Sequence, residues 1–258
     1  MTNDKSRPFF SIITVVFNRS EQIGGALKSL YGQDFSDFEH IIIDGGSSDG
    51  TLGLLYSFDY QNREPIIISE PDNGLYDALN KGIKICRGQY IGVLHSDDSY
   101  FGCDVLSRAS KAAIESEAQL VFADAVFVKK NDGSKIYRRY SSQNSNVQSI
   151  KSGLMPAHTA LFIAREVYEE IGLYNLKYKI ASDFDFVART ILSERYQVEY
   201  CKEIWIKMTG GGVSTSSIKN KIIINREVVM SLREQGVDIG SLFYLKRYLK
   251  KLSGYFHF

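Results

Sequence analysis

Cysteine, net charge and long apolar runs are all scarce in this chain, and each scarcity excludes a class of protein. The three cysteines lie far apart without a C-x-x-C pair, which argues against a disulfide framework and a cysteine zinc site. The formal net charge of the 258 residues is +1, so no basic excess draws the chain to nucleic acid. No run approaches the roughly 18 to 20 apolar residues of a membrane span, and residues 1–7 are polar. We therefore expect a cytoplasmic globular protein without a nucleic-acid partner.

The first hundred residues alternate between strand-like and helix-like apolar patterns. With 44% hydrophobic residues, the chain can bury a substantial core. This alternation predicts βαβ units around a mostly parallel, buried sheet. The expected strands are 10–17, 39–44, 65–69 and 90–94, and the expected helices are 23–31, 51–58 and 75–86.

The pattern changes after residue 100. A helix at 104–117, a strand at 120–128 and a turn at 131–133 feeding a strand at 135–139 predict a smaller, partly antiparallel lobe. Residues 140–153 are polar and rich in Ser and Asn, so we expect a loop there. No linker is long enough to separate two independent domains.

Acidic residues follow two of the predicted strands at the point where each strand ends. Asp44 opens a stretch with three glycines and a second aspartate, Asp49, and the adjacent pair Asp97 and Asp98 follows strand 90–94. Parallel strands place such ends along one sheet edge, where open α/β sheets bind nucleotides. Asn18-Arg19-Ser20 follows the first strand instead of G-x-G-x-x-G, which argues against a nicotinamide oxidoreductase. Asn18 and Glu21 fit a capping box for the first helix.

Several motifs follow one another along the chain. They are Ser11 to Asn18, Asp44 to Thr51, Ser69 to Gly82, Ser96-Asp97-Asp98, Pro156-Ala157-His158, Ala181 to Asp185 and Gly211 to Thr215. In this order they resemble the family 2 glycosyltransferases with the GT-A fold, and within them the bacterial colanic-acid, exopolysaccharide and O-antigen branch. The resemblance covers roughly residues 9–215. It implies a glycosyltransferase domain at 1–215, with a nucleotide-binding half (1–98), an acceptor-side half (99–215) and a C-terminal helical extension (216–258).

Ser96-Asp97-Asp98 stands where the family has its D-x-D motif. The resemblance implies that Asp98 is a ligand of Mn²⁺ or Mg²⁺, hard cations that prefer carboxylate oxygen, and that Asp97 contacts the donor sugar or ribose. This chain departs from the family pattern by starting the motif with Ser96, which makes its dependence on metal an open question. The alternative is that these acids cap the next helix.

The resemblance also implies a donor nucleotide site. Asp44 corresponds to the acid that accepts a hydrogen bond from the base, uracil in most members, while Asp72 and Lys81 approach the nucleotide. For Lys81 the alternative is an i,i+4 pair with Asp77. For Asp49 the cap of the second helix is the better interpretation.

On the acceptor side, the resemblance implies that Asp183, rather than Asp185, is the general base, and a helix cap is its alternative. His158 contacts the donor diphosphate or the acceptor, or is simply a packed residue. Gly211 and Gly212 are expected in a loop near the phosphates.

The overall hypothesis is an inverting transferase, hexosyl or N-acetylhexosaminyl, that moves one sugar from a nucleotide-diphosphate sugar, with UDP as the expected nucleotide. The Gln-x-x-Arg-Trp signature of processive synthases is missing, since the single tryptophan is Trp205. The alternative from another class is a catalytically silent sugar-nucleotide or glycan-binding module.

The end of the chain predicts an interfacial helix. Within 242–252, leucines share one face and basic residues, including Arg247, share the other. We therefore expect peripheral contact of 241–258 with the inner face of the plasma membrane and a lipid-linked oligosaccharide as acceptor in bacterial surface polysaccharide synthesis. The alternatives are a surface helix docked on the body and a contact in a homo-oligomer.

Overall fold

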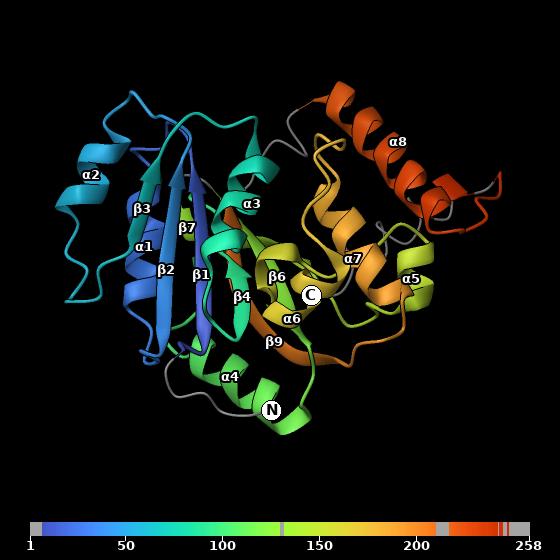
Figure 1. The fold of residues 1–258 in the computed structure, drawn as a ribbon, viewed down its shortest axis with the longest axis horizontal. Coiled ribbons are helices and arrows are strands. Elements are labelled where there is room, and N and C mark those ends of the chain that lie inside the picture. Colours follow the sequence, from blue (N-terminus) through green and yellow to red (C-terminus); the bar gives the residue numbers. More distant parts are fainter. Residues whose placement is uncertain (1–6, 130–131, 210–216, 242, 245–246, 248–258) are drawn as a thin grey trace.

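The computed structural model describes residues 7–129, 132–209, 217–241, 243–244 and 247, and it shows one mixed sheet covered by helices (Figure 1). The strand order is β3 (Ile66–Ser69), β2 (Phe38–Asp44), β1 (Phe10–Val16), β4 (Tyr90–Val93), β8 (Leu161–Ala164), β6 (Leu120–Lys129), β9 (Val198–Thr209) and β5 (Asp98–Tyr100), and β7 (Asp132–Tyr140) pairs with β6. The strands of the first half are parallel to one another, as the alternating pattern predicts. The second half adds antiparallel pairs to the same sheet, so the two halves are continuous rather than separate lobes.

The first half forms its parallel sheet because its strands are apolar on both faces. Every residue of β1 is buried, and the polar Thr14 within it is matched by a 3.0 Å contact between its hydroxyl and His40 Nε2. The elements of this half are β1 Phe10–Val16, α1 Ile23–Tyr31, β2 Phe38–Asp44, α2 Thr51–Ser57, β3 Ile66–Ser69, α3 Leu75–Ile85 and β4 Tyr90–Val93.

The second half surrounds the long strand β6, which pairs with β7 and β8 antiparallel and with β9 parallel. Residues 140–153, expected as a loop, contain the short helix α5, because Asn146 and Ser149 form a reciprocal capping box. The elements are β5 Asp98–Tyr100, α4 Val105–Ser116, β6 Leu120–Lys129, β7 Asp132–Tyr140, α5 Val147–Lys151, the 3₁₀ turn η1 His158–Ala160, β8 Leu161–Ala164, α6 Arg165–Ile171, α7 Ser182–Leu192, β9 Val198–Thr209 and α8 Ile218–Glu234.

The helix α8 packs against α7, at the opposite end of the view from α2 (Figure 1). Its residues Val228, Val229 and Leu232 are buried and belong to the same hydrophobic core as the strands. Burial of these side chains holds the helix to the body.

The described end of the chain packs on the body as well. Phe243 is buried, and Arg247, expected on a polar face, is only 4% exposed and donates from Nε to the carbonyl of Gly153 at 3.0 Å. The prediction that Arg247 lies on an exposed basic face is therefore wrong, because its guanidinium satisfies a backbone carbonyl. The leucines of that segment lie outside the described residues. Among the described helices, none combines the length and apolarity needed to cross a bilayer.

Candidate active site

Hydrogen bonds connect the loop after β1 to the loop after β2 at the carboxyl edge of the parallel strands. Asn18 donates its N–H to the Ser47 hydroxyl (2.8 Å) and accepts the N–H of Ser48 at its side-chain oxygen (2.9 Å). Asn18 adopts φ 51°, and α1 begins at Ile23 without a side-chain cap, so the predicted capping box is wrong. The Asn18 side chain instead bonds to the loop after β2.

Asp49 joins the same two loops. Its Oδ2 accepts from the backbone N–H (3.1 Å) and hydroxyl (3.0 Å) of Ser20, and its Oδ1 accepts from the N–H of Thr51 (3.0 Å), the first residue of α2. The residue at the formal cap position is Gly50, with φ 94°. Asp49 therefore stabilises the start of α2 from one residue further out while it fixes the β1–α1 loop.

Asp44, the last residue of β2, is fully buried and has one carboxylate oxygen without a partner. Its Oδ2 accepts from the N–H groups of Gly46 (3.1 Å) and Ser47 (3.0 Å) and from the hydroxyl of Ser69 (2.7 Å). Its Oδ1 is buried and has no hydrogen-bond partner among the described residues. Because a buried carboxylate oxygen without a donor is costly, the geometry suits a ligand N–H at this place.

Asp72 is held beside this strand end. Its Oδ1 accepts the N–H of Gly74 at 2.8 Å, and its carboxylate lies so close to Gly45 that a Cβ there would come within 2.5 Å of Oδ2. Only glycine at position 45 allows this approach, so the loop after β3 closes over the loop after β2. We refer to residues 70–74, which include Asp72, predicted from the sequence to approach the donor nucleotide, as the donor loop.

Lys81 of α3 binds the donor loop through a hydrogen bond and an ion pair. Its ammonium donates to the carbonyl of Pro71 (2.9 Å) and pairs with Glu70 (2.8 Å), while Asp77 is farther away at 3.8 Å. The hydrogen bond to Glu70 raises the pKa of Lys81, so it stays charged. The i,i+4 pair with Asp77 is present, but the close contacts of Lys81 are with the donor loop.

Asp97 and Asp98 form an acidic pair without a described counterion. Asp98 is buried at the start of β5, and burial, followed by the charge of Asp97, raises its pKa well above the usual range. The two aspartates line a cavity of about 270 Å³ that also includes Glu21 and Thr209. No ion pair to either aspartate exists among the described residues. The helix-cap alternative is wrong, because Asp98 lies in a strand and α4 begins only after Asp104.

This donor set fits a hard divalent cation held only partly by protein. Two adjacent carboxylates, one of them buried without a described counterion, would lose their mutual repulsion to a bound cation. Within the described residues there is no group of three or more His, Cys, Asp or Glu side chains that could form a complete metal site. Mg²⁺ and Mn²⁺ are commonly bound through one or two carboxylates, with phosphate and water as the other ligands.

Asp183 and Asp185 have different environments at the start of α7. Asp185 is buried. One of its carboxylate oxygens pairs with Arg189 at 2.9 Å and the other accepts a hydrogen bond from the Ser231 hydroxyl at 2.8 Å, so both oxygens are occupied by contacts within the protein. Asp183 is half-buried, and its Oδ1 accepts the N–H of Phe184 (2.7 Å) and faces the Tyr76 hydroxyl (3.1 Å). Burial raises the pKa of Asp183. Of the two, only Asp183 has the setting of a proton acceptor.

Two histidines form a pair: His95 directly precedes the acidic motif, and His158 is the first residue of η1. The rings of His95 and His158 have centroids 6.0 Å apart, and His158 Nε2 contacts the Tyr174 hydroxyl at 2.8 Å. Burial lowers the pKa of each histidine to about 4, and in His95 the charges of Asp97 and Asp183 act in the opposite direction. His95 was not identified from the sequence, although its place directly before Ser96-Asp97-Asp98 was a signal. Tyr76 and Tyr174 gave no local signal.

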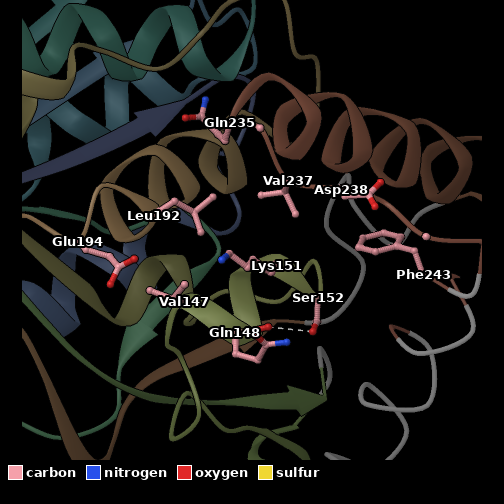
Figure 2. Close-up of a pocket in the computed structure, with 12 residues that line it drawn as sticks. Val147, Gln148, Lys151, Ser152, Leu192, Glu194, Gln235, Val237, Asp238 and Phe243 are labelled. Carbon is pink, nitrogen blue, oxygen red and sulfur yellow. Dashed lines mark hydrogen bonds between the residues drawn. The ribbon is translucent and has the colours of Figure 1, made fainter.

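Two of the predicted site residues have no described position. Gly211 and Gly212 lie outside the described residues. A second cavity, of about 490 Å³, lies between α5, the end of α7 and the turn after α8, and Figure 2 shows Lys151, Glu194 and Asp238 at its wall. None of the predicted site residues lines it, so it is separate from the aspartate cluster.

Comparison with known proteins matches the chain to glycosyltransferases. The sequence pattern described as glycosyl transferase family 2 matches residues 11–172, well over half of the chain. A PGL/p-HBAD biosynthesis glycosyltransferase of Mycobacterium bovis is 29% identical over 221 residues, which cover 85% of this chain and 84% of that protein. The matched pattern includes Asp44, Asp72 and Asp98 but ends before Asp183.

Solved structures share the fold at low identity. The structure of S. aureus TarS 1–349 in complex with UDP-GlcNAc superposes with a TM-score of 0.66 at 17% identity, covering 96% of this chain and 72% of that one. The mannosyltransferase PcManGT from Pyrobaculum calidifontis, in complex with GDP-Man and Mn²⁺, gives 0.67 at 17% identity, with coverage of 94% and 70%. The predicted GT-A fold class is thereby confirmed.

Proposed function

We propose that this chain, which belongs to glycosyl transferase family 2 and is a glycosyltransferase that uses a nucleotide sugar, moves one sugar from a UDP-sugar to an acceptor hydroxyl with inversion. The family match at residues 11–172 includes the proposed donor residues and His158, while the role of Asp183 is argued from geometry. The transferred group is a hexosyl or N-acetylhexosaminyl residue.

The donor base binds at Asp44 in this proposal. The buried Oδ1 without a partner is positioned to accept an N–H, and uracil offers one at N3. The TarS complex with UDP-GlcNAc supports a UDP-sugar, whereas the PcManGT complex with GDP-Man makes a GDP-sugar the main competitor. Asp72 lies in the donor loop beside Asp44, and Lys81 holds that loop in place.

Asp98 would hold Mn²⁺ or Mg²⁺, with Asp97 directed at the donor sugar or ribose. A bound cation of this kind offsets the negative charge that develops on the diphosphate oxygens as the bond to the sugar breaks. The Mn²⁺ in the PcManGT complex supports this assignment. Gly211 and Gly212 are proposed to approach the diphosphate through their backbone.

Asp183 acts as the general base. Its carboxylate takes the proton of the acceptor hydroxyl while the hydroxyl oxygen bonds to the anomeric carbon, and the bond from that carbon to the diphosphate oxygen breaks on the opposite face. The raised pKa of Asp183 favours proton uptake compared with an exposed aspartate. His158 and Tyr174 form part of the neutral wall beside this step.

One observation carries the proposal. Tyr76, which follows the donor loop as the second residue of α3, places its hydroxyl 3.1 Å from Asp183 Oδ1, so the donor side and the proposed base are joined through one side chain. A transferase needs this proximity between the leaving-group side and the base, whereas a binding module does not.

The acceptor is a lipid-linked oligosaccharide of bacterial surface polysaccharide synthesis, reached at the inner face of the plasma membrane through residues 241–258. The support is the basic sequence around Lys250 and Lys251. A homo-oligomer contact through the same segment is the competing proposal.

The function is tested by donor turnover. The purified chain is incubated with UDP-, GDP- and dTDP-sugars in Mn²⁺, in Mg²⁺ and in EDTA, beside Asp98→Ala, Asp183→Asn and the control Asp59→Asn, an exposed aspartate after α2. We expect turnover of one UDP-sugar that needs metal, is lost in Asp98→Ala and is retained in Asp59→Asn. Donor binding without turnover in the presence of cell-extracted glycolipid would favour the silent binding module.

The membrane contact is tested on vesicles. The full chain should sediment with anionic vesicles but not with neutral ones, and Lys250→Ser with Lys251→Ser should remove the binding. Lys28→Ser with Lys84→Ser, which removes two exposed charges elsewhere, is the control. Equal sedimentation of all three proteins would contradict membrane contact through this segment, and a concentration-dependent change in mass would favour the oligomer.

A further inference from the structure

Tyr76 connects the donor loop to the residue proposed as the base. It is the second residue of α3, directly after the donor loop, and it is only 6% exposed. Its ring packs beside that of Tyr174, with centroids 5.7 Å apart. The ring is therefore held, and its hydroxyl has a fixed place.

The Tyr76 hydroxyl has one proton and two acceptors within reach. It donates to the carbonyl oxygen of Ile180 at 2.6 Å and lies 3.1 Å from Asp183 Oδ1. Both acceptors are more than 100 residues away in the sequence, so this contact ties the two halves of the site together. Burial raises the pKa of Tyr76 well above its ordinary value, so the hydroxyl keeps its proton at neutral pH.

The Ile180 peptide is held from its other side. The N–H of Ala181, which shares a peptide group with the Ile180 carbonyl, donates to Glu227 Oε2 of α8 at 2.9 Å, so this carbonyl cannot move away from Tyr76 without disturbing that bond. The hydroxyl of Tyr76 can thus donate either to the fixed carbonyl oxygen of Ile180 or to the carboxylate of Asp183, whose charge changes in the proposed reaction. A charged acceptor is the stronger one.

Hydrogen bonds also fix the turn between the donor loop and α3, the helix that carries Tyr76. Asp72 Oδ1 accepts the N–H of Gly74, and Asp77 accepts the N–H of Asn73 at 3.0 Å, two bonds that shape the turn into α3. A displacement of the donor loop therefore moves the start of α3 and with it Tyr76.

We infer that Tyr76 is a positioning residue for the transfer: its hydroxyl donates to Asp183 while that carboxylate is charged, and turns to the Ile180 carbonyl once Asp183 has taken a proton. The inference rests on the proposed function in taking Asp183 as the base. No covalent bond changes at Tyr76, since only the direction of its O–H is exchanged between two acceptors.

Within the described residues, the other titratable groups that interact with the Asp183 charge are uncharged at neutral pH. They are His95, whose pKa lies near 4, and Tyr140 and Tyr174, whose pKa values burial raises above the ordinary value of 10. The hydrogen bond from Tyr76 lowers the pKa of Asp183 against the larger effect of burial. Loss of the hydroxyl should consequently leave Asp183 a weaker acid.

The test is a direct titration of Asp183. Carboxyl ¹³C NMR of aspartate-labelled protein, with the Asp183 signal assigned by its loss in Asp183→Asn, is compared between the natural chain, Tyr76→Phe and Tyr60→Phe. Tyr60 is an equally buried tyrosine that donates to the Leu55 carbonyl at 2.7 Å in the first half. We expect the Asp183 titration midpoint to rise by about half to one pH unit in Tyr76→Phe and not in Tyr60→Phe.

Activity gives the second readout. With the UDP-sugar that the chain turns over in Mn²⁺, kcat of Tyr76→Phe should fall about tenfold, with its acidic limb at higher pH and the donor KM within about twofold. An unchanged or lowered Asp183 midpoint in folded Tyr76→Phe overturns the inference. If instead the midpoint rises but Asp183→Asn retains full activity, the contact stands and the assignment of the base fails.

Discussion

Glu227 on α8 accepts a hydrogen bond of 2.9 Å from the backbone N–H of Ala181, 46 residues earlier in the chain. The same carboxylate accepts the N–H groups of Lys179 (2.8 Å) and Ile180 (2.9 Å), so one side chain binds three consecutive amides. These amides lead directly into the first turn of α7, where Asp183 lies. The helix α8 thus holds residues 179–181, which lead to the proposed base. This contact connects α8, which lies in the predicted C-terminal extension at 216–258, directly to the segment before α7.

Replacing Glu227 by Gln should lower the free energy of unfolding by about 2 to 3 kcal/mol, because a buried charged acceptor of three amides becomes a neutral one with a donor of its own. Urea denaturation measures the change. Glu234→Gln, on the same helix but exposed and paired with Lys177, is the control and should change stability by at most about 1 kcal/mol. Equal effects of the two variants would show that the three amide bonds contribute little.

Asp44→Asn should weaken UDP binding by about tenfold or more. The oxygen side of the new amide can face the Gly46 and Ser47 amides or the ligand N–H, but not both, so one N–H always meets another N–H. Calorimetric titration with UDP and Mn²⁺ measures the affinity, and Asp59→Asn serves as the exposed control. Unchanged affinity in Asp44→Asn would mean that the base does not reach Oδ1.

Activity should fall on the acid side at a higher pH than an ordinary aspartate would cause. The reaction needs Asp183 as a carboxylate, and burial raises its pKa above the ordinary value of 3.8, so kcat is lost as the pH falls through that raised value. Asp183→Asn should reduce kcat by about 10² to 10⁴-fold with UDP affinity retained. A pH profile of kcat with saturating donor checks the first point, and full activity in the variant would remove Asp183 from the mechanism.

Stability should decline in mild acid because of His40. Burial lowers the pKa of His40 from 6.5 to about 3 in the folded chain, so between these values the unfolded chain binds a proton that the folded chain does not. The free energy of unfolding therefore decreases as the pH falls, with about 1.4 kcal/mol per pH unit from this residue. His40→Gln should flatten the dependence by that amount in urea titrations between pH 6 and pH 4. An identical slope in the variant would contradict the assignment.

The parts of the site that follow directly from strand ends could be predicted from the sequence. Asp44 and Asp72 stand next to recognisable apolar runs and glycine turns, and their neighbouring places after the paired strands β2 and β3 follow from parallel topology. Asp98 lies instead in β5, which pairs with β9 at the other end of the strand order. The capping prediction for Asn18 failed because its side chain bonds Ser48, 30 residues later, and a local rule does not include such a competitor.

Tyr76, Tyr174 and Glu227 could not be predicted, since their contacts join segments that are far apart in the sequence. The Tyr76 contact with Asp183 spans 107 residues, and a buried tyrosine on a helix has no pattern that separates a functional hydroxyl from a packed ring. His95 differs, because a histidine beside an acidic motif already suggests a titratable group at the site.

The position of β5 at the end of the sheet has a consequence for synthesis on the ribosome. The four parallel strands β1 to β4 are complete once residue 93 has emerged, whereas β5, which carries Asp98, has β9 at residues 206–208 as its one partner among the described strands. A nascent chain can therefore assemble the strands around Asp44, the proposed base-binding residue, about a hundred residues before the strand that carries Asp98 has its partner. We expect such an intermediate to be folded at Asp44 and yet unable to transfer a sugar until β9 is added.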